Sequence, residues 1–286
     1  MLYLQPPLHY ARPVRIALAQ LDFRLGDVAA NAARARDTLA GAAHAGAELV
    51  VFPELQLSGY ALGRVDGDVA CTAEALLGLV AAEHAAAALL GFAERDGDRT
   101  YNSAAYVEGG ALVHVHRKLY LPHYDAFEEA DVFAPGESLR AFDTALGRVG
   151  VLICNDAWQP VVPFLAVHDG AQILLLPSNS SGAMPEAEEY WRELTRFYAR
   201  MLECYVVFVN RVGEEAGLTF WGGSHVVDPL GEIVAEAPRL EESLLLVELD
   251  LERVAARRRE VPLLAGPRLD LLAAELERIS DVPTHH

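Results

Sequence analysis

The sequence predicts a single α/β domain. Short runs of branched apolar residues alternate with longer segments of helical periodicity in both halves of the chain, and such alternation is typical of helices packed on sheets. The chain has 286 residues, of which 52% are apolar and 22% charged, an ordinary composition for a globular protein. It contains no linker, low-complexity segment or short repeat. We therefore expect residues 1–13 to form an extension and residues 14–280 to form one domain.

The first half of the domain is predicted from its apolar runs and from local stop signals. Asp27 is a suitable N-terminal cap for an alanine-rich helix, and Gly46 follows its end. Glu108-Gly109-Gly110 is suited to a tight hairpin. The expected segments are a strand at 14–21, a helix at 27–44, a strand at 49–52, a helix at about 72–88 and strands at 89–93, 103–107 and 111–115.

A long irregular loop, residues 119–140, joins this half to the next, and long loops in compact domains are more often functional than idle. Beyond it, Asp228-Pro229-Leu230-Gly231 predicts a turn between two β-segments. The expected segments are strands at 149–153, 173–176 and 205–209, helices at 161–169 and 187–203, β-segments near 219–228 and 231–236, a strand at 244–249 and helices near 251–259 and 268–279.

The charge of the chain excludes some classes of partner. A net charge of −18 argues against nucleic acid, because binding it requires a basic face. The basic cluster Arg257-Arg258-Arg259 lies among acidic residues, and we expect it to be a solvated helix face. No apolar stretch approaches the length of a membrane span, and the first residues carry no signal-peptide pattern.

The three cysteines, Cys71, Cys154 and Cys204, are odd in number and widely spaced. This argues against a disulfide framework and favours a reducing, cytoplasmic location. No Cys-x-x-Cys spacing is present and the histidines are scattered, so we expect no metal and no cofactor. His116 is expected to be structural rather than a metal ligand. Cys71 and Cys204 are expected to be buried and inert.

Glu54, Lys118 and Cys154 each stand just past the end of a predicted strand. Taken singly, they are most simply a turn residue, a solvated lysine and a small buried apolar group. If their strands are neighbours, however, all three face one cleft at the carboxyl ends of the strands. A carboxylate can accept a thiol proton, a close ammonium favours the thiolate, and a fixed donor stabilises an oxyanion.

The segments around these residues resemble the motifs of the nitrilase, or carbon–nitrogen hydrolase, superfamily. They are Phe52-Pro53-Glu54-Leu55, His116-Arg117-Lys118-Leu119-Tyr120-Leu121-Pro122 and Ile153-Cys154-Asn155-Asp156. Supporting matches are Gln20, Asn31, Tyr101-Asn102-Ser103, Phe133-Ala134-Pro135-Gly136, Asn210 and Gly223-Ser224. The matches cover nearly the whole chain, and their order and spacing make the resemblance specific.

The resemblance implies a four-layer α-β-β-α sandwich that forms homodimers or larger homo-oligomers. It also implies that Cys154 is the nucleophile, that Glu54 is the general base, and that Lys118 and the backbone N–H of Asn155 stabilise the oxyanion. A second glutamate, which holds the lysine, aligns with Glu129, and Glu128 is the alternative.

The residues after the nucleophile favour an amidase over a true nitrilase. Asn155-Asp156 follows Cys154 directly, where true nitrilases typically have tryptophan and glutamate. Asp156-Ala157-Trp158-Gln159-Pro160 and Asn210-Arg211-Val212-Gly213 are similar to the glutaminase domains of NAD synthetases. We therefore expect hydrolysis of a small linear amide with release of ammonia. An N-carbamoyl amide hydrolase, an ammonia-donating glutaminase-type subunit and an oligomeric binding protein with a silent site are the alternatives.

The substrate pocket is predicted from polar and aromatic residues near these motifs. The candidates are Tyr60, Tyr124, Trp158, Asn179 and Trp221, each of which is equally well explained as a core or dimer contact. Arg192, Arg196 and Arg200 are expected on a helix surface, so no arginine is predicted to bind a substrate carboxylate.

Overall fold

The computed structural model of the chain describes residues 12–280 except 66, 81–85, 125–126 and 185. Its centre is a pair of six-stranded sheets. The first sheet contains, in spatial order, β16 (Ser243–Leu249), β1 (Val14–Gln20), β2 (Leu49–Val51), β3 (Ala87–Asp96), β4 (Arg99–Glu108) and β5 (Ala111–Arg117). The second contains β15 (Ile233–Glu236), β14 (His225–Val227), β11 (Tyr205–Asn210), β10 (Ile173–Ser178), β9 (Gly147–Val151) and β8 (Phe142–Thr144).

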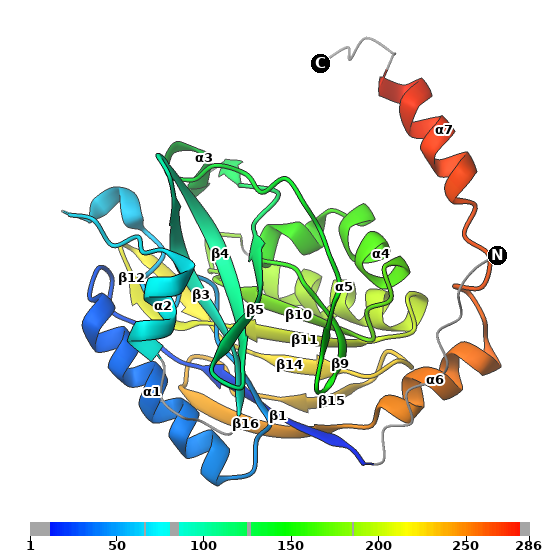
Figure 1. The fold of residues 1–286 in the computed structure, drawn as a ribbon, viewed down its shortest axis with the longest axis horizontal. Helices are drawn as coiled ribbons and strands as arrows, with labels where there is room; N and C mark the ends of the chain where they lie inside the picture. Colours follow the sequence, from blue (N-terminus) through cyan, green and yellow to red (C-terminus); the bar gives the residue numbers. More distant parts are fainter. Residues whose placement is uncertain (1–11, 66, 81–85, 125–126, 185, 281–286) are drawn as a thin grey trace.

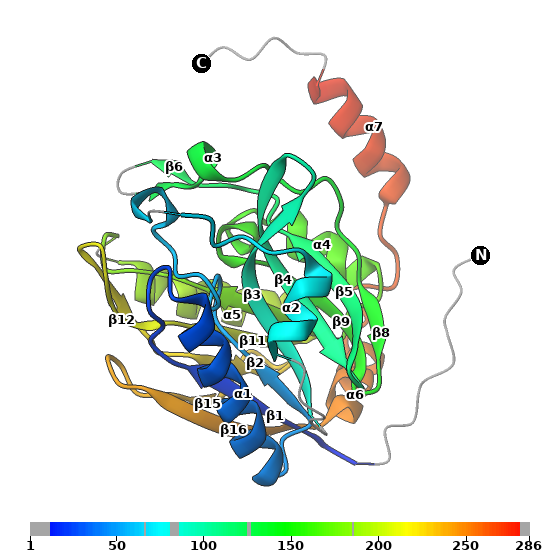
Figure 2. The ribbon, with the colours of Figure 1, turned by 60° about the vertical axis from the view of Figure 1, so that its left-hand side comes forward.

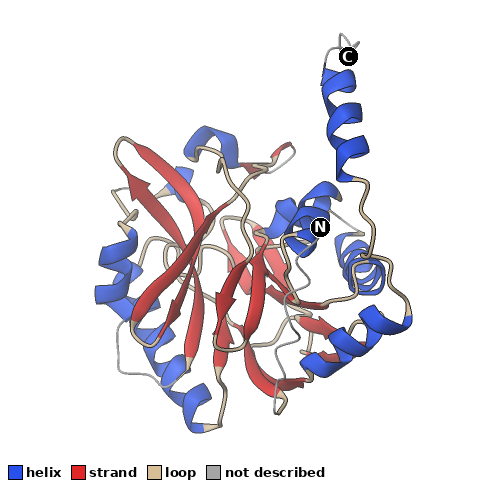
Figure 3. Ribbon diagram, turned by 45° about the vertical axis from the view of Figure 1, so that its right-hand side comes forward, coloured by secondary structure: helices blue, strands red, loops and turns tan. Residues whose placement is uncertain are grey.

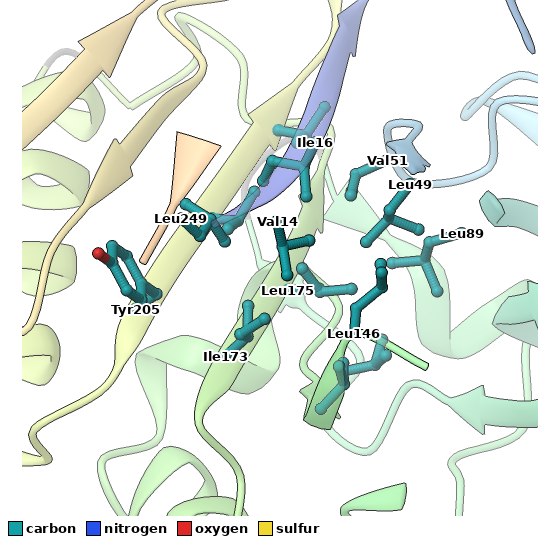
Figure 4. Close-up of a cluster of buried hydrophobic side chains, with 14 of the residues drawn as sticks. Val14, Ile16, Leu49, Val51, Leu89, Leu146, Ile173, Leu175, Tyr205 and Leu249 are labelled. Atoms are coloured by element: carbon teal, nitrogen blue, oxygen red, sulfur yellow. The ribbon is translucent and has the colours of Figure 1, made fainter. Parts of the chain in front are cut away.

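The two sheets pack face to face, as the alternation of side chains along β1 demonstrates. Ile16 and Leu18 point into a buried cluster shared with Val151 and Leu175 of the second sheet, and Figure 4 shows this cluster between strands of the two sheets. Because successive side chains of a strand point to opposite faces, the intervening Ala17 packs on the outer side of its sheet.

Helices cover both outer faces (Figures 1 and 3). The helices α1 (Val28–His44) and α2 (Ala73–Val80) share an apolar cluster with the outer face of the first sheet. The helices α4 (Val161–His168) and α5 (Ala187–Met201) do the same for the second sheet. The layers are therefore α-β-β-α, and the predicted fold class is confirmed.

Strand direction brings several chain segments to one edge of the molecule. Strands β1, β2 and β3 are parallel, as are β9, β10 and β11. Strand β5 is antiparallel to β4, which is antiparallel to β3, so β5 runs in the same direction as β2. The segments that follow β2, β5, β9 and β10 carry Glu54, Lys118, Cys154 and Asn179.

Local sequence signals predicted several boundaries correctly. The side chain of Asp27 caps α1 by accepting a hydrogen bond from the Ala30 backbone N–H, at 3.1 Å. Gly109 and Gly110 connect β4 to β5 with φ of 58° and 76°, the combination that a two-residue hairpin with the right twist requires.

Two predicted segments were wrong. Of the helix expected at 72–88, the structure describes Ala73–Val80 as helical, and residues 81–85 lie outside the described part of the chain. Ala87 and Ala88 belong to β3, where they pair with Leu49 and Val50 of β2. Sheet pairing overrides the helical propensity of these alanines. The β-segment expected at 219–228 is two strands, β13 (Leu218–Trp221) and β14. They are separated at Gly222 and Gly223, whose φ values are 73° and 61°.

The loop at 119–140 contains short regular elements that the sequence did not indicate. They are β6 (His123–Tyr124), β7 (Phe127–Glu128) and α3 (Glu129–Val132). A hairpin of β12 (Val212–Glu215) with β13 was also not predicted. The structure also contains two short 3-10 helices, η1 (Leu62–Arg64) and η2 (Cys154–Trp158).

The basic cluster was predicted to be a solvated helix face, which is wrong for Arg258. It lies on α6 (Leu251–Glu260), where Arg258 shares a helix face with the buried Leu251 and Val254. The Arg258 guanidinium donates to the backbone carbonyls of Glu203 and Ala171, at 3.2 and 2.8 Å. It therefore ties α6 to the second sheet's loops.

The last helix, α7 (Leu269–Ser280), extends away from the sandwich in Figures 1 and 2, and none of its residues is buried. Residues 1–11, most of the predicted N-terminal extension, lie outside the described part of the chain. Among the described helices, none combines the length and apolar character needed to cross a membrane.

Candidate active site

Lys118, directly after β5, is fully buried between two carboxylates. Its Nζ lies 2.6 Å from Oε1 of Glu54 and 2.7 Å from Oε1 of Glu129. A buried ammonium is tolerated only when such partners replace its hydration. Burial by itself lowers the pKa of Lys118, but the charges of Glu129 and Glu54 outweigh burial and raise it. Lys118 therefore remains a cation at the pH of any ordinary assay.

Glu54 is fixed from several sides. Its Oε1 also accepts a hydrogen bond from Asn102 Nδ2 at 2.7 Å, and its Oε2 accepts one from the Asn179 backbone N–H at 2.9 Å. The Asn179 side-chain amide donates to the Glu54 backbone carbonyl at 2.8 Å. Gly91 of β3 is so close that a Cβ there would overlap the backbone of residues 53–55. The carboxylate of Glu54 is thus held in one place.

Glu129, the first residue of α3, titrates near neutrality. Burial raises its pKa, the charge of Lys118 lowers it and the charge of Glu54 raises it again, with a net value of about 7. Tyr60 donates its hydroxyl to Glu129 Oε1 at 2.6 Å. Burial and the charges of Glu129 and Glu54 raise the pKa of Tyr60 well above its ordinary value, so this phenol remains a donor.

Cys154 begins η2 at the end of the β9 segment. Its φ of 45° is in the left-handed region that non-glycine residues rarely occupy. Its low-dielectric surroundings and the charge of Glu54 raise its pKa, while Lys118 lowers it by less. The net direction is upward, although the sequence had suggested that the ammonium would favour the thiolate. The resting thiol therefore keeps its proton and needs a base in order to react.

The charges of Glu54, Lys118 and Glu129 all act on the Cys154 thiol, so the structure brings these four predicted residues together. A cavity of about 40 Å³ opens beside them. It is lined by Tyr60, Pro122, Glu129, Cys154, Asn155, Trp158, Asn179, Ser180, Ser181, Met184, Ala187 and Trp191. At roughly 10–15 Å³ per water molecule, this space accommodates a group of only a few heavy atoms.

The other predicted pocket residues lie in different places. Trp158 and Asn155 line the cavity, and the Asn155 side chain donates to the Tyr120 backbone carbonyl at 3.1 Å. Trp221 is not among the lining residues. It stacks on Phe208 in the core of the second sheet, and its indole N–H donates to the hydroxyl of Ser180, which does line the cavity. The backbone of Tyr124 is in β6, but its side chain lies outside the described part of the structure.

The arginines of α5 lie on the helix surface, as the sequence predicted. Arg192 pairs with Glu236, and Arg196 and Arg200 donate to the backbone carbonyls of Gly231 and Leu230. No arginine is among the residues lining the described cavity.

Two groups of polar partners were not identified from the sequence. Asn102 contacts both carboxylates of the site, at 2.7 Å from Glu54 and 3.3 Å from Glu129. Glu215, buried and paired with Arg211, accepts hydrogen bonds at 2.7 Å from the backbone N–H groups of Tyr60 and Ala61. The signal for Asn102 was present, because two adjacent polar residues, Asn102 and Ser103, interrupt the apolar and aromatic residues in the buried part of β4.

A second cavity, of about 410 Å³, shares Tyr60 and Glu129 with the first and continues along η1 and the turn between β12 and β13. The other cysteines lie elsewhere. Cys204 is buried, whereas Cys71 is partly exposed rather than buried; burial and nearby acids raise its pKa to about 11. Within the described residues, no group of three or more histidine, cysteine or acidic side chains is arranged to hold a metal ion.

Comparison with known proteins matches residues 15–259 to the carbon-nitrogen hydrolase family. An (R)-stereoselective amidase from a Pseudomonas species is 35% identical over 273 residues, which cover 92% of this chain and 95% of that protein. The glutamine-dependent NAD(+) synthetase of Thermotoga maritima is 34% identical over 245 residues, covering 84% of this chain and 42% of the synthetase. This chain thus spans less than half of that relative. The crystal structure of a carbon-nitrogen hydrolase from Helicobacter pylori matches with a TM-score of 0.83 at 27% identity, over 94% of this chain and 99% of that one.

Proposed function

The chain belongs to the carbon-nitrogen hydrolase family, and we propose that it hydrolyses a small linear amide through an acyl-enzyme on Cys154, releasing ammonia. One observation carries this proposal. A buried ammonium, Lys118, contacts the carboxylates of Glu54 and Glu129 beside a thiol whose pKa is raised. A neutral thiol next to a fixed carboxylate is suited to general-base activation, and a fixed cation is suited to an oxyanion.

In the first half of the reaction, Glu54 takes the proton of the Cys154 thiol as sulfur attacks the amide carbon. The electron pair of the C=O bond moves to oxygen, and Lys118 and the Asn155 backbone N–H stabilise the resulting oxyanion. The intermediate collapses, the C–N bond breaks, and protonated Glu54 returns the proton to nitrogen, which leaves as ammonia. The acyl group remains on sulfur as a thioester.

In the second half, water enters and Glu54 takes one of its protons as the oxygen attacks the thioester carbon. The second tetrahedral intermediate uses the same oxyanion donors. The C–S bond then breaks, the thiolate recovers the proton from Glu54, and the carboxylic acid is released. Glu129, hydrogen-bonded to Lys118 and Tyr60, is expected to hold the ammonium in place throughout.

The cavity favours an uncharged acyl group. Glu129 is the charged side chain among its lining residues, which also include the thiol of Cys154. The remaining residues are apolar or aromatic (Trp158, Trp191, Met184, Ala187, Pro122) or neutral and polar (Tyr60, Asn155, Asn179, Ser180, Ser181). Within this small cavity a substrate carboxylate would find no arginine among the described lining residues to pair with, whereas Arg64 lines the larger adjoining cavity. The larger adjoining cavity makes amides with a substituent on nitrogen worth including in assays.

The test is a panel of small amides, N-carbamoyl compounds and nitriles assayed for ammonia and for carbon dioxide. Mass spectrometry of the protein from substrate mixtures should reveal an acyl adduct on Cys154. Cys154→Ala should lower turnover by about 10⁴-fold or more without changing the fold, whereas Cys71→Ala should retain full activity. Carbon dioxide together with ammonia would identify a carbamoyl substrate, and no turnover of any panel member would favour a binding protein with a silent site.

A second candidate is a glutaminase-type subunit that donates ammonia to a separate synthetase. The 34% identity to the glutamine-dependent synthetase favours it, and so does Arg64 in the wall of the larger cavity. The small cavity beside Cys154 opposes it, because no arginine is among the described residues that line that cavity. Glutamine hydrolysis that increases when a synthetase co-purifies would establish this role. Glutamine turnover below that of neutral amides would exclude it.

We also propose that the chain forms a homodimer in a reducing, cytoplasmic environment. Large apolar side chains are exposed on neighbouring helices, Val161 and Leu165 on α4 and Phe197 and Met201 on α5, and the resemblance implies dimers. Light scattering after size-exclusion chromatography should give the mass of two chains. The double substitution Leu165→Glu with Phe197→Glu should give one, and an unchanged mass would place the dimer contact elsewhere. The three free cysteines support the reducing environment.

A further inference from the structure

Asp156, two residues after Cys154, is a buried carboxylate with four hydrogen-bond donors around it. Its Oδ1 accepts from the backbone N–H groups of Leu119 and Tyr120, at 2.8 and 3.0 Å. Its Oδ2 accepts from the backbone N–H of Ile153 at 3.0 Å and lies 2.9 Å from Nε2 of His116. These donors come from two segments that are distant in the sequence, one flanking Lys118 and the other flanking Cys154.

On the cysteine side, the contacts of Asp156 close a turn around a strained residue. Left-handed backbone at a non-glycine residue costs on the order of 1–3 kcal/mol and persists only when its surroundings impose it. Cys154 has φ of 45°, and Asp156 closes the turn twice. Its carboxylate accepts from the Ile153 N–H, and its own N–H donates to the Ile153 carbonyl at 3.0 Å.

On the lysine side, Asp156 contacts residues on both sides of Lys118. His116 is the last residue but one of β5, and Leu119 and Tyr120 follow the lysine. The Lys118 backbone itself is held by Asn102 and Gly136, whose bonds to it are both 2.8 Å. One carboxylate therefore links the turn that presents the thiol to the segment that presents the ammonium.

We propose that Asp156, together with His116, is a positioning residue that sets the placement of the Cys154 thiol relative to the Lys118 ammonium. This inference rests on the proposed function, because it assigns no chemistry of its own to Asp156. The Asp156 carboxylate is fully buried and is not among the residues lining the cavity. It acts through the two segments that it joins, and displacement of reacting groups by about 1 Å costs roughly 10²-fold in rate.

Asp156→Asn should keep the contacts on the lysine side and break the contact on the cysteine side. An ionised carboxylate only accepts hydrogen bonds, whereas an amide has one accepting oxygen and one donating NH₂ group. The amide oxygen can keep the two donors on the lysine side, and the NH₂ group can donate to His116. The same NH₂ group then faces the Ile153 N–H, donor against donor, so the turn at Cys154 loses its contact.

Asp228 offers a matched control far from the site. It is equally buried, and its Oδ1 accepts from the backbone N–H groups of Leu230 and Glu232, at 2.9 and 3.1 Å. Its Oδ2 pairs with Arg253. Asp228→Asn therefore makes the same chemical change to a buried, turn-holding carboxylate, and its effects on general stability should be similar.

The experiment compares Asp156→Asn, Asp228→Asn and the parent in a Cys71→Ala background, so that alkylation reports on Cys154. With an amide that the enzyme turns over, Asp156→Asn should lower kcat about tenfold or more while KM changes less than about threefold. Labelling of Cys154 by iodoacetamide should slow by a comparable factor. Asp228→Asn should change neither, even where its Tm falls equally.

The proposal would be overturned if Asp156→Asn and Asp228→Asn lost kcat equally at matched Tm. It would also be overturned if Asp156→Asn kept the parental kcat and the parental rate of labelling. If Asp156→Asn does not fold, His116→Leu removes one of the four contacts, because leucine has no donor. This variant should lower kcat by about threefold or more at constant KM, and parental kcat would overturn the proposal. The labelling arm needs no substrate. Parental proteins that label at Cys154 but hydrolyse no amide would refute the proposed function and leave the positioning role testable.

Discussion

The raised pKa of Glu129 predicts the direction in which the stability of the protein changes with pH. Glu129→Gln keeps the length of the side chain and one oxygen that can accept from Lys118, but it removes the charge and the titratable proton. The folded-state pKa of Glu129 is about 7, against an ordinary value of 4.5. The folded protein therefore binds this proton more tightly than the unfolded chain does.

The size of the effect follows from linkage between proton binding and folding. The contribution of Glu129 to stability is fully present below about pH 4.5 and is lost as the pH rises through about 7. The rise of the Glu129 pKa from 4.5 to about 7 corresponds to roughly 3 kcal/mol. For a chain of this size that is several °C in Tm, at roughly 2 °C per kcal/mol.

The assay is Tm measured between about pH 5 and pH 8 for the parent and for Glu129→Gln. The difference in Tm, variant minus parent, should increase across this range, because only the parent loses the contribution of the bound proton. Titrating groups that do not interact with Glu129 cancel in the difference. The rate profile of kcat/KM should also lose a limb near pH 7 in the variant.

Parallel Tm profiles for the two proteins would refute the assignment of this titration to Glu129. Glu128→Gln is the matched control, because the sequence left Glu128 as the alternative. If Glu128→Gln reproduces the loss of the limb near pH 7 and Glu129→Gln does not, the second glutamate of the site is Glu128.

Three further predictions concern the supports of the site and a buried acid. Lys118→Met should lower kcat by at least about 10²-fold and destabilise the fold by roughly 3–5 kcal/mol in urea, because two buried carboxylates lose their cation; a variant of parental stability would contradict this. Gly91→Ala should lower both activity and Tm, since its Cβ would overlap the backbone at 53–55, whereas Gly78→Ala, with open space around an exposed helix position, should be neutral or stabilising by about 0.5–1 kcal/mol. Burial raises the pKa of Glu203, so the contribution of its bound proton to stability is lost as the pH rises above the ordinary carboxyl range. Glu203→Gln should therefore raise Tm more at about pH 8 than at about pH 4. An equal gain in Tm at both pH values would show that the charge of Glu203 is compensated.

Much of the fold could be predicted because its signals are local. The cap at Asp27, the hairpin at Gly109 and Gly110 and the apolar run before Cys154 each depend on residues within a few positions of one another. Where the local signal was ambiguous, pairing with a neighbouring strand determined the secondary structure. Ala87 and Ala88 suit a helix by propensity, yet they pair with β2, a strand nearly 40 residues earlier.

The partners of the site were harder to predict because their contacts are long-range. Asn102 is 48 residues from Glu54, and Asp156 is 37 residues from Leu119. A pattern of neighbouring residues in the sequence carries no information on pairs that are so far apart. Trp221 illustrates the reverse case: its position in the sequence placed it near the site, but it packs on Phe208 in the core of the second sheet.

By itself, the sequence predicted the class of chemistry, because its motifs around Glu54, Lys118 and Cys154 resemble those of the carbon–nitrogen hydrolase superfamily, and the match to that family confirms the membership. Only the tertiary structure decided how those groups behave. The net rise in the Cys154 pKa and the near-neutral pKa of Glu129 depend on burial and on charges from distant segments. Desolvation and Coulomb interactions are properties of position in space, and distance along the chain does not determine them.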